Sequence, residues 1–482
     1  MSAPRGRFKV GIVGGGLAGL ATSHRLLALA EAAGQSLDVV LFERDRTLGG
    51  KVHSQWSEAG VLVERGPDSF LTRKPALLDL LEEIGLSDQL IATNGTALSS
   101  AIYCRGRMRP LPAGMGALVP ADITAFLRSD LLTVGGRMRA LRDLWLRPPP
   151  EGDLSLRQVI GQRLGTEYLL HVAEPLMAGI HSADPDQMSV AATMPGLLTF
   201  LSQDRSLMRG ARRQMRRRPS SAMPPFMSLR HGMGSLIGAL DSHLPGIDRR
   251  LGSEVESIAQ ADRRIAVRAK TTDGRTSEEL VDAIVVATPA FAASRLLSAM
   301  WPDLAQQLAQ IPTHLALTIT YAYRRQAIPG PLTGHGWLIP RDQGLTMRGA
   351  TVMTNKWPGR STSPDLVSIR AFLGGPSQDA LKETTDQTLA ELVATEMSRL
   401  LKVKEAPLEA SVERVTEGNP EYRVGHLDRL AQIDRLLDSA PQLAVAGASY
   451  RGVGLPDVVR SGQEAASRVW RGLARSEPKA GP

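Results

Sequence analysis

The residues that decide the fold are FKVGIVGGGLAGLATSHRLLALAEAAGQSLDVVLFERDRTLGGK, at positions 8–51. Phe8–Val13 is a short, mostly apolar run, which predicts a buried strand. A cluster of glycines follows, and then a stretch rich in alanine and leucine predicts a helix that ends near Ala33. Leu37–Phe42 predicts a second strand. The order strand, glycine turn, helix, strand is typical of a parallel α/β sheet.

Three glycines, Gly14, Gly16 and Gly19, have the spacing of a dinucleotide-binding turn. In such a turn the first glycine permits the sharp bend, the second lets the backbone approach a pyrophosphate, and the third lets the helix pack closely on the strand. The N-terminus of the helix attracts the anion. Glu43 ends the second strand, where a carboxylate accepts hydrogen bonds from ribose hydroxyls. The alternative is a tight turn beside a solvated glutamate.

Further glycine turns favour FAD over NAD as the dinucleotide. Leu48-Gly49-Gly50-Lys51 follows Glu43 closely, and ERGPDSF at 64–70 places another glycine after a strand. An NAD site needs neither turn. At the far end, AGASYRGVGLPD at 446–457 follows a predicted strand at 442–446 and opens a helix, whose N-terminal amides could face a pyrophosphate or the electron-rich edge of a flavin. A plain helix cap is the alternative. The sequence therefore predicts an FAD site that is split between the two ends of the chain.

The chain of 482 residues is too long for one hydrophobic core, so several domains are expected. Strands are predicted at 264–269, 283–286, 315–323 and 366–373, with helices at 74–85 and 387–401. We predict an FAD-binding α/β domain built from residues 1–88, 226–300 and 438–482. A helical domain at 89–225 and a substrate-binding α+β domain at 301–437 interrupt it.

Composition excludes several kinds of site. The single cysteine, Cys104, excludes an internal disulfide and a cysteine-rich metal centre, and no histidine pair has the spacing of metal ligands, so no metal is predicted. A lone cysteine suits a reducing cytoplasm. No apolar run is long enough to span a bilayer. The net charge of +8 favours anionic partners in general.

Several motifs together resemble a known family. GGGLAGL, FERDRTLGGK, VERGPDSFLTRK and AGASYRGVGLPDVVRSG are similar to the flavin monoamine oxidase superfamily. RPLPAG at 109–114, AEPLMAGIH at 173–181 and YRVGHL at 422–427 resemble, within it, the oxygen-dependent porphyrinogen oxidases of haem synthesis. GPDSFLTRK at 66–74 and GASYRGVGLPD at 447–457 resemble most closely their bacterial coproporphyrinogen-using branch. The resemblance covers nearly the whole chain. It implies a Rossmann-like FAD domain of the p-hydroxybenzoate hydroxylase type, with a helical domain of the membrane-binding kind.

The resemblance also implies which residues contact a non-covalently bound FAD. Pyrophosphate contacts fall on the first turn, ribose contacts on Glu43 and Arg44, and ring contacts on the loop at 66–69. The full set is Gly14, Gly15, Gly16, Leu17, Ala18, Gly19, Glu43, Arg44, Lys51, Gly66, Pro67, Asp68, Ser69, Val255, Ala448, Val453, Gly454 and Leu455.

The implied reaction is the oxidation of a porphyrinogen to a porphyrin, with three oxygen molecules reduced to three of hydrogen peroxide. Aromatisation drives it, so no potent acid–base pair is required. Asp68 is the candidate catalytic residue, although it could equally cap a turn. Arginine forks suit the substrate's propionates. Candidates for substrate binding are Arg73, Lys74, Arg105, Arg107, Arg109 and His426, each with a solvated or structural role as its alternative.

The arginine-rich tract around Arg212, Arg213, Arg216, Arg217 and Arg218 is interpreted first as a mobile basic loop. Contact with anionic lipid is the second interpretation. Nucleic-acid binding comes last, because stacking aromatics are scarce there, and we predict no nucleic-acid partner. We expect a cytoplasmic monomer or homodimer, with peripheral contact on the inner face of the membrane, or hand-over to the next enzyme of the haem pathway, as further options.

Other functions remain as alternatives. The resemblance to the bacterial branch favours coproporphyrinogen III, with four propionates, as substrate, and the abundant basic residues fit such an anion; protoporphyrinogen IX is the runner-up. A flavin amine oxidase or a carotenoid desaturase would share the flavin motifs but not the segments between them. A binding protein of the same fold without flavin, of the kind that escorts prenylated proteins, is the alternative from another class.

Overall fold

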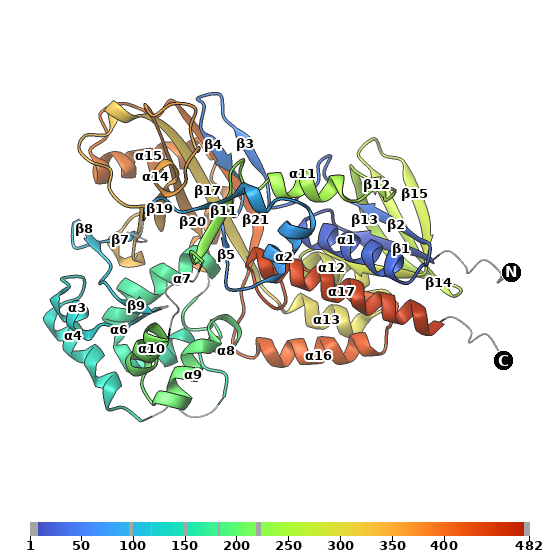
Figure 1. Ribbon diagram of the computed structural model, residues 1–482, viewed down its shortest axis with the longest axis horizontal. Coiled ribbons are helices and arrows are strands. Elements are labelled where there is room, and N and C mark those ends of the chain that lie inside the picture. The colour runs from blue at the N-terminus through green and yellow to red at the C-terminus, as the bar shows by residue number, and fades with distance from the viewer. Residues whose placement is uncertain are drawn as a thin grey trace.

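The structure is a computed structural model that describes residues 8–95, 100–116, 118–147, 152–181, 184–217 and 223–476. Figure 1 shows a parallel sheet with its helices at one end, where both termini lie, and a larger sheet and a helical part at the other. Within the described residues, no helix combines the length and apolarity that crossing a membrane requires.

The parallel sheet has the strand order β12-β2-β1-β16-β22. Its strands come from widely separated parts of the chain: β1 (Phe8–Val13), β2 (Leu37–Phe42), β12 (Asp248–Arg250), β16 (Ala283–Val286) and β22 (Leu443–Val445). The strands and helix expected at 8–42 are confirmed, with α1 at Leu17–Ala32. The chain therefore forms an α/β fold whose central sheet is completed by the C-terminal segment.

Alternate residues of β1, β2, β16 and β22 enter two different cores. Val10 and Ile12 of β1 pack with four helices on one face: α1, α2 (Ala76–Glu83), α11 (Ser235–Ser242) and α17 (Leu455–Ser476). Ile284 and Val286 of β16 pack on the other face. That face is covered by α12 (Ala290–Leu297), α13 (Pro302–Ala309), α16 (His426–Asp438) and the antiparallel sheet of β13 (Ser253–Ala261), β14 (Arg264–Thr271) and β15 (Thr276–Val281).

A seven-stranded sheet forms the larger half, in the order β21-β17-β20-β19-β18-β7-β8. Its strands are β7 (Ser100–Cys104), β8 (Arg107–Pro110), β17 (Thr313–Arg324), β18 (Gly336–Leu338), β19 (Gly349–Val352), β20 (Leu366–Gly374) and β21 (Glu409–Pro420). Helix α15 (Asp386–Leu401) contributes Leu389, Val393 and Met397 to the core on one face.

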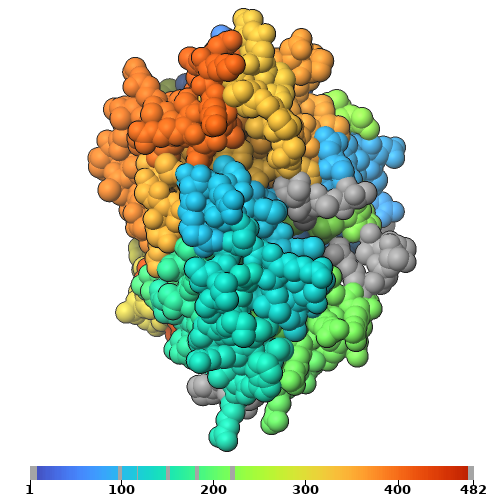
Figure 2. Space-filling model, turned by 90° about the vertical axis from the view of Figure 1, so that its left-hand side faces the viewer, coloured from blue at the N-terminus to red at the C-terminus, as the bar shows by residue number. Residues whose placement is uncertain are grey.

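One element differs from the expected organisation. The segment 89–225 was expected to be helical, yet β7 and β8 lie in it and extend the seven-stranded sheet through parallel pairing of β7 with β18. The hairpin is too short to carry a periodic signal of its own, and a strand from a distant part of the chain provides its partner. Figure 2 shows this hairpin, in light blue, between the sheet in orange and the helical part in teal and green.

Short elements connect these layers. They are β3 (Ser54–Trp56), β4 (Leu62–Glu64), β5 (Phe70–Leu71), η1 (Ser87–Gln89), β6 (Leu90–Ala92), β9 (Met115–Gly116), β10 (Val119–Pro120), β11 (Phe226–Leu229), η5 (Arg325–Ala327), η6 (Arg341–Gln343), α14 (Met353–Lys356) and η7 (Pro376–Glu383). The β3–β4 hairpin packs against the larger sheet, since Val61 and Val63 share a small core with Ala322 of β17.

The helical part has a core of its own. Its helices are α3 (Ile123–Arg128), α4 (Val134–Leu141), η2 (Arg142–Leu144), η3 (Arg157–Gly161), α5 (Gln162–Leu164), α6 (Thr166–Tyr168), η4 (Leu169–Ala173), α7 (Glu174–His181), α8 (Val190–Thr193), α9 (Pro195–Asp204) and α10 (Leu207–Arg216).

The interpretation of the arginine-rich tract as a loop was wrong, because most of it forms α10. Ser206 caps this helix by accepting a hydrogen bond from the Arg209 N–H (3.2 Å). Leu207 and Ala211 are buried on one side, while the arginines gather on the other. Apolar side chains lie on one face of α10 and basic side chains on the other, and this separation stabilises the helix. The high density of charge in the sequence had suggested a loop instead. Arg218 lies outside the described residues.

The buried carboxylate of Asp143 joins separate segments of the helical part, and replacing Asp143 tests how much these contacts contribute to stability. Its buried carboxylate accepts hydrogen bonds from Arg163 Nε (2.5 Å), the Ser206 hydroxyl (2.7 Å) and the Met208 N–H (2.9 Å). We expect Asp143→Ala to lower the free energy of unfolding by about 3–5 kcal/mol, because Arg163 keeps a buried, unpaired charge. Asp122→Ala, which removes an exposed helix cap, should cost about 1 kcal/mol. Equal losses in chemical denaturation would contradict this assignment.

Candidate cofactor and substrate site

The first glycine turn has the geometry that its sequence predicts. Gly14 has a φ of +108°, which side chains rarely allow, and its N–H donates to the Phe42 carbonyl (2.8 Å). A Cβ added at Gly19 would lie 1.9 Å from the carbonyl oxygen of Gly14. Helix α1 can therefore begin this close to β1 only because position 19 has no side chain.

Gly16 lies on the open side of the same turn. It forms a parallel bridge with Gly49, whose N–H donates to the Gly15 carbonyl (2.9 Å). A Cβ at Gly16 would meet no atom nearer than 3.9 Å apart from its chain neighbours. Protein packing therefore does not require glycine here, whereas the close approach of a pyrophosphate to the backbone and to the N-terminus of α1 does. The residues present fit a dinucleotide cofactor.

Glu43 braces this turn through the backbone. One carboxylate oxygen accepts from the Gly15 N–H (2.7 Å) and the other from the Asp45 N–H (2.9 Å). The side chain is buried. Because each carboxylate oxygen can accept more than one hydrogen bond, Glu43 keeps acceptor capacity for a ribose hydroxyl. Arg44 is largely exposed and lies 3.7 Å from Asp45.

The C-terminal glycine turn follows β22, at the same edge of the sheet as the turn after β1, because the strands are parallel. The Gly447 N–H donates to the Ser461 hydroxyl of α17 (3.0 Å). Helix α17 lies against α1 (Figure 1), so closely that a Cβ at Gly462 would be 2.5 Å from the Ala18 carbonyl oxygen. The two ends of the chain thus place their glycine turns together.

Tyr422 closes the C-terminal turn, a role that the sequence did not reveal. Its hydroxyl donates to the Ala448 carbonyl and accepts from the Gly452 N–H (2.9 Å). The ring of His426 stacks on that of Tyr422, with centroids 4.1 Å apart. Burial raises the pKa of Tyr422 above 10, which keeps its hydroxyl protonated as a donor. The residue lies in a motif used for the family resemblance, and that was its only signal.

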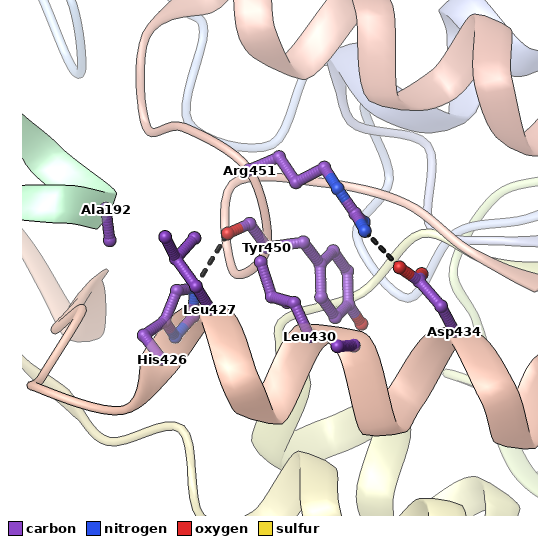
Figure 3. Close-up of a pocket in the computed structure, with 8 residues that line it drawn as sticks. Ala192, His426, Leu427, Leu430, Asp434, Tyr450 and Arg451 are labelled. Atoms are coloured by element: carbon purple, nitrogen blue, oxygen red, sulfur yellow. Dashed lines mark hydrogen bonds and ion pairs between the residues drawn. The ribbon is translucent and has the colours of Figure 1, made fainter. Parts of the chain in front are cut away.

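His426 has a structural environment. Its Nε2 lies 2.8 Å from the Tyr450 carbonyl oxygen, as Figure 3 shows, and burial lowers its pKa. It lines a pocket of about 260 Å³ between α8 and α16, together with Leu430 and Arg451. None of the residues expected to contact FAD lines this pocket. The geometry therefore favours support of the C-terminal turn over substrate binding for His426.

Three other predicted cofactor residues have environments of different kinds. Lys51 donates through Nζ to the Gly418 carbonyl of β21. The residue as a whole is exposed, but protein atoms surround its ammonium group, and this desolvation lowers the pKa of Lys51 to about 8. Val255 is buried at a bulge in β13. Leu455 begins α17 and is buried.

Asp68 connects the loop at 66–69 to the larger sheet. Its carboxylate accepts hydrogen bonds from Lys356 Nζ (2.7 Å) and Trp357 Nε1 (2.8 Å). Burial disfavours the charge, but Lys356 and Arg370 outweigh it and hold the pKa of Asp68 well below its usual range. Such a weak base is poorly suited to accept a proton, so the geometry favours an anchoring role. Sequence reasoning missed Lys356 and Trp357, which belong to no motif.

The basic residues expected to bind substrate have different environments. Arg73 is exposed and makes no ion pair among the described residues. Lys74 pairs with the buried Asp457 of α17. The three arginines of the β7–β8 hairpin face Asp130 and backbone carbonyls. Arg105 donates to the Asp130 and Leu131 carbonyls, and Arg107 pairs with the Asp130 carboxylate at 2.6 Å. Arg109 is buried and donates to the Cys104 carbonyl. The sequence shows only that these residues are positively charged, and it does not show which guanidinium groups already bind other groups of the protein.

Known proteins share this architecture. Residues 17–470 match the family of flavin-containing amine oxidoreductases, so the chain belongs to that family and is a flavin-dependent oxidoreductase. It is similar to the coproporphyrinogen III oxidase of Staphylococcus aureus, with 30% identity over 95% of this chain and 98% of the relative. A coproporphyrinogen III oxidase of Propionibacterium freudenreichii is 33% identical over 97% of this chain and 92% of its own.

A solved structure gives the same result for the fold. A provisionally assigned protoporphyrinogen oxidase from Exiguobacterium sp. 255-15 superposes with a TM-score of 0.84 and 31% identity, over 98% of this chain and all of the other. The resemblance inferred from the motifs is therefore confirmed.

The open space beside Gly16 leads to a test by substitution. Gly16→Ala should fold with unchanged stability, because its methyl group would lie no closer than 3.9 Å to a protein atom, but should weaken FAD binding at least about tenfold by blocking the pyrophosphate. Gly238→Ala is the matched control, since a Cβ there meets nothing within 4 Å. Titration of FAD into the apoprotein, followed by flavin fluorescence, measures the difference. Equal affinities for the two variants would show that no ligand approaches Gly16.

A second test concerns the hydroxyl of Tyr422. Tyr422→Phe leaves a carbonyl and an N–H of the C-terminal turn without this partner, so FAD affinity should fall roughly thirtyfold, at about 1 kcal/mol for each of the two lost hydrogen bonds. Tyr321→Phe also removes one buried hydrogen bond, to the Ala390 carbonyl (2.7 Å), but in another core. This control should lose stability and keep its FAD affinity. Unchanged affinity in Tyr422→Phe would refute the role of the hydroxyl.

Proposed function

We propose that the protein is an FAD-dependent oxidase that converts coproporphyrinogen III to coproporphyrin III with oxygen as electron acceptor. The proposal is supported by the nearly full-length similarity to two coproporphyrinogen III oxidases. The ring gives up six hydrogen atoms, and three oxygen molecules take them up as three of hydrogen peroxide. FAD, when bound, supplies a two-electron acceptor.

The proposed FAD site combines both ends of the chain. The turn at 14–19, with Glu43 and the glycines at 49–50, would hold the pyrophosphate and ribose, while the loop at 66–69 and the turn at 447–455 would hold the flavin. The position of Cys104 supports non-covalent binding, because this single cysteine is buried in the core of the helical part.

Among the basic residues, Arg73 is the best proposed contact for a substrate carboxylate. It follows the loop at 66–69 directly, it is exposed, and no carboxylate of the described residues pairs with it. An arginine fork pairs with a carboxylate through two parallel hydrogen bonds. Lys74, Arg105, Arg107 and Arg109 are engaged elsewhere, so a role for them would require the present contacts to break.

We retain a cytoplasmic location and peripheral membrane contact as proposals. Large apolar side chains are exposed in the helical part, namely Val134, Met138 and Trp145, the last with 76% of its surface accessible. Arg142 and Arg147 are exposed beside them. Apolar side chains flanked by arginines suit the surface of an anionic bilayer. Hand-over of product to a further enzyme, and a monomeric or homodimeric state, stay predictions.

Turnover of porphyrinogens tests the proposed function. We expect the purified holoprotein to oxidise coproporphyrinogen III under air, with porphyrin fluorescence and three molecules of peroxide for each porphyrin formed. Protoporphyrinogen IX, the alternative substrate favoured by the similarity to the Exiguobacterium protein, should react more slowly. Heat-denatured protein gives the rate of autoxidation. A rate no greater than this background for both substrates would refute the proposal, and acid release of FAD tests non-covalent binding.

A further inference from the structure

Three cations meet behind the loop at 66–69. They are Lys356, Arg360 and Arg370, called the cationic cluster below. Lys356 lies 2.7 Å from the Asp68 carboxylate. Arg360 is only 1% exposed and lies 4.0 Å from the equally buried Glu64. Arg370 is 3% exposed, and burial lowers its pKa while the charges of Asp68 and Glu64 act in the opposite direction. Such a concentration of buried charge requires an explanation.

Arg370 has few hydrogen-bond partners. Its Nη2 donates to the Thr318 hydroxyl at 3.2 Å, while Nε is buried without a partner. Thr320 is the residue opposite Arg370 on the neighbouring strand, and its hydroxyl is also buried and unpartnered, as is that of Ser368. Because water cannot reach these atoms, a substrate carboxylate cannot bind to them either. Arg370 is therefore placed to act on the site through its electric field.

The carboxylates around the cluster do not balance its charge. Glu64, Asp68 and Glu413 act on Arg370, but Glu413 is already paired with Arg65 at 2.6 Å. Three cations, of which Arg360 and Arg370 are buried and Lys356 is half-buried, thus face two carboxylates. Burial also raises the pKa of Glu64, in spite of the hydrogen bond from Ser54. The surroundings of the loop therefore carry excess positive charge in a low-dielectric interior.

We propose that the cationic cluster holds the flavin-ring loop at positive potential and so makes the protein bind reduced, anionic FAD more tightly than oxidised FAD. Uptake of two electrons and one proton, all supplied by the substrate, leaves the flavin ring with one more negative charge than the oxidised ring. A fixed positive charge stabilises that state without contact. The inference rests on the FAD site proposed above, and it assigns to Arg370 a role in setting the reduction potential.

The reduction potential of bound FAD tests this role. Arg370→Met keeps the volume and removes the charge, and we expect the preference for reduced FAD to fall roughly tenfold, as a unit charge about 10 Å away would produce at an effective dielectric of about 20. Tenfold corresponds to a potential about 30 mV more negative. The matched control is Arg414→Met, because Arg414 belongs to the same sheet but pairs opposite Leu317 and binds Asp386 on the other face. The reduction potential of FAD bound to Arg414→Met should equal that of FAD bound to the wild-type protein.

Two further variants make the test independent of whether Arg370→Met folds. Glu413→Gln removes a carboxylate, so the potential should move in the positive direction, opposite to that of Arg370→Met. Arg370→Lys keeps the charge and should keep the potential. An unchanged potential in Arg370→Met, or a negative shift in Glu413→Gln, would overturn the inference. Failure of the wild-type protein to take up FAD would instead refute the proposed function.

Discussion

The close approach of α1 to β1 is the constraint on which the rest of the structure depends. The carbonyl of Gly14 occupies the space that a side chain at Gly19 would need, so the helix begins directly above the end of the strand. Its N-terminal amides then face the edge of the sheet, where an anion is attracted. Three other contacts surround this position. Gly49 bridges to Gly16, Glu43 accepts a hydrogen bond from the Gly15 N–H, and α17 packs on α1.

The groups that support the turns come from distant parts of the chain. Tyr422 closes the C-terminal turn, Lys356 and Trp357 hold the loop at 66–69, and Gly418 accepts the Lys51 ammonium. A cofactor site of this kind is therefore a set of local backbone turns that are fixed in place by side chains from the larger sheet. The electrostatic environment of the loop belongs to that sheet as well.

Sequence reasoning predicted the parts of the fold that depend on local pattern. The strands at 8–13, 37–42 and 283–286 were predicted because apolar periodicity and glycine spacing are local properties. The partners of Asp68 and Tyr422 could not be predicted, because they depend on pairing across hundreds of residues. The arginines at 105–109 were unpredictable in another way, since residue type does not say whether a guanidinium faces a ligand, a carboxylate or a carbonyl.

The contact between α1 and α17 has a consequence for how the protein is made. The Thr22 hydroxyl of α1 donates to the carbonyl of Gly462, which lies 440 positions later in the chain. During synthesis the surface of α1 that α17 covers therefore stays exposed until the last helix has been made. A chain cut short before α17 would keep this apolar surface exposed, which favours aggregation and degradation.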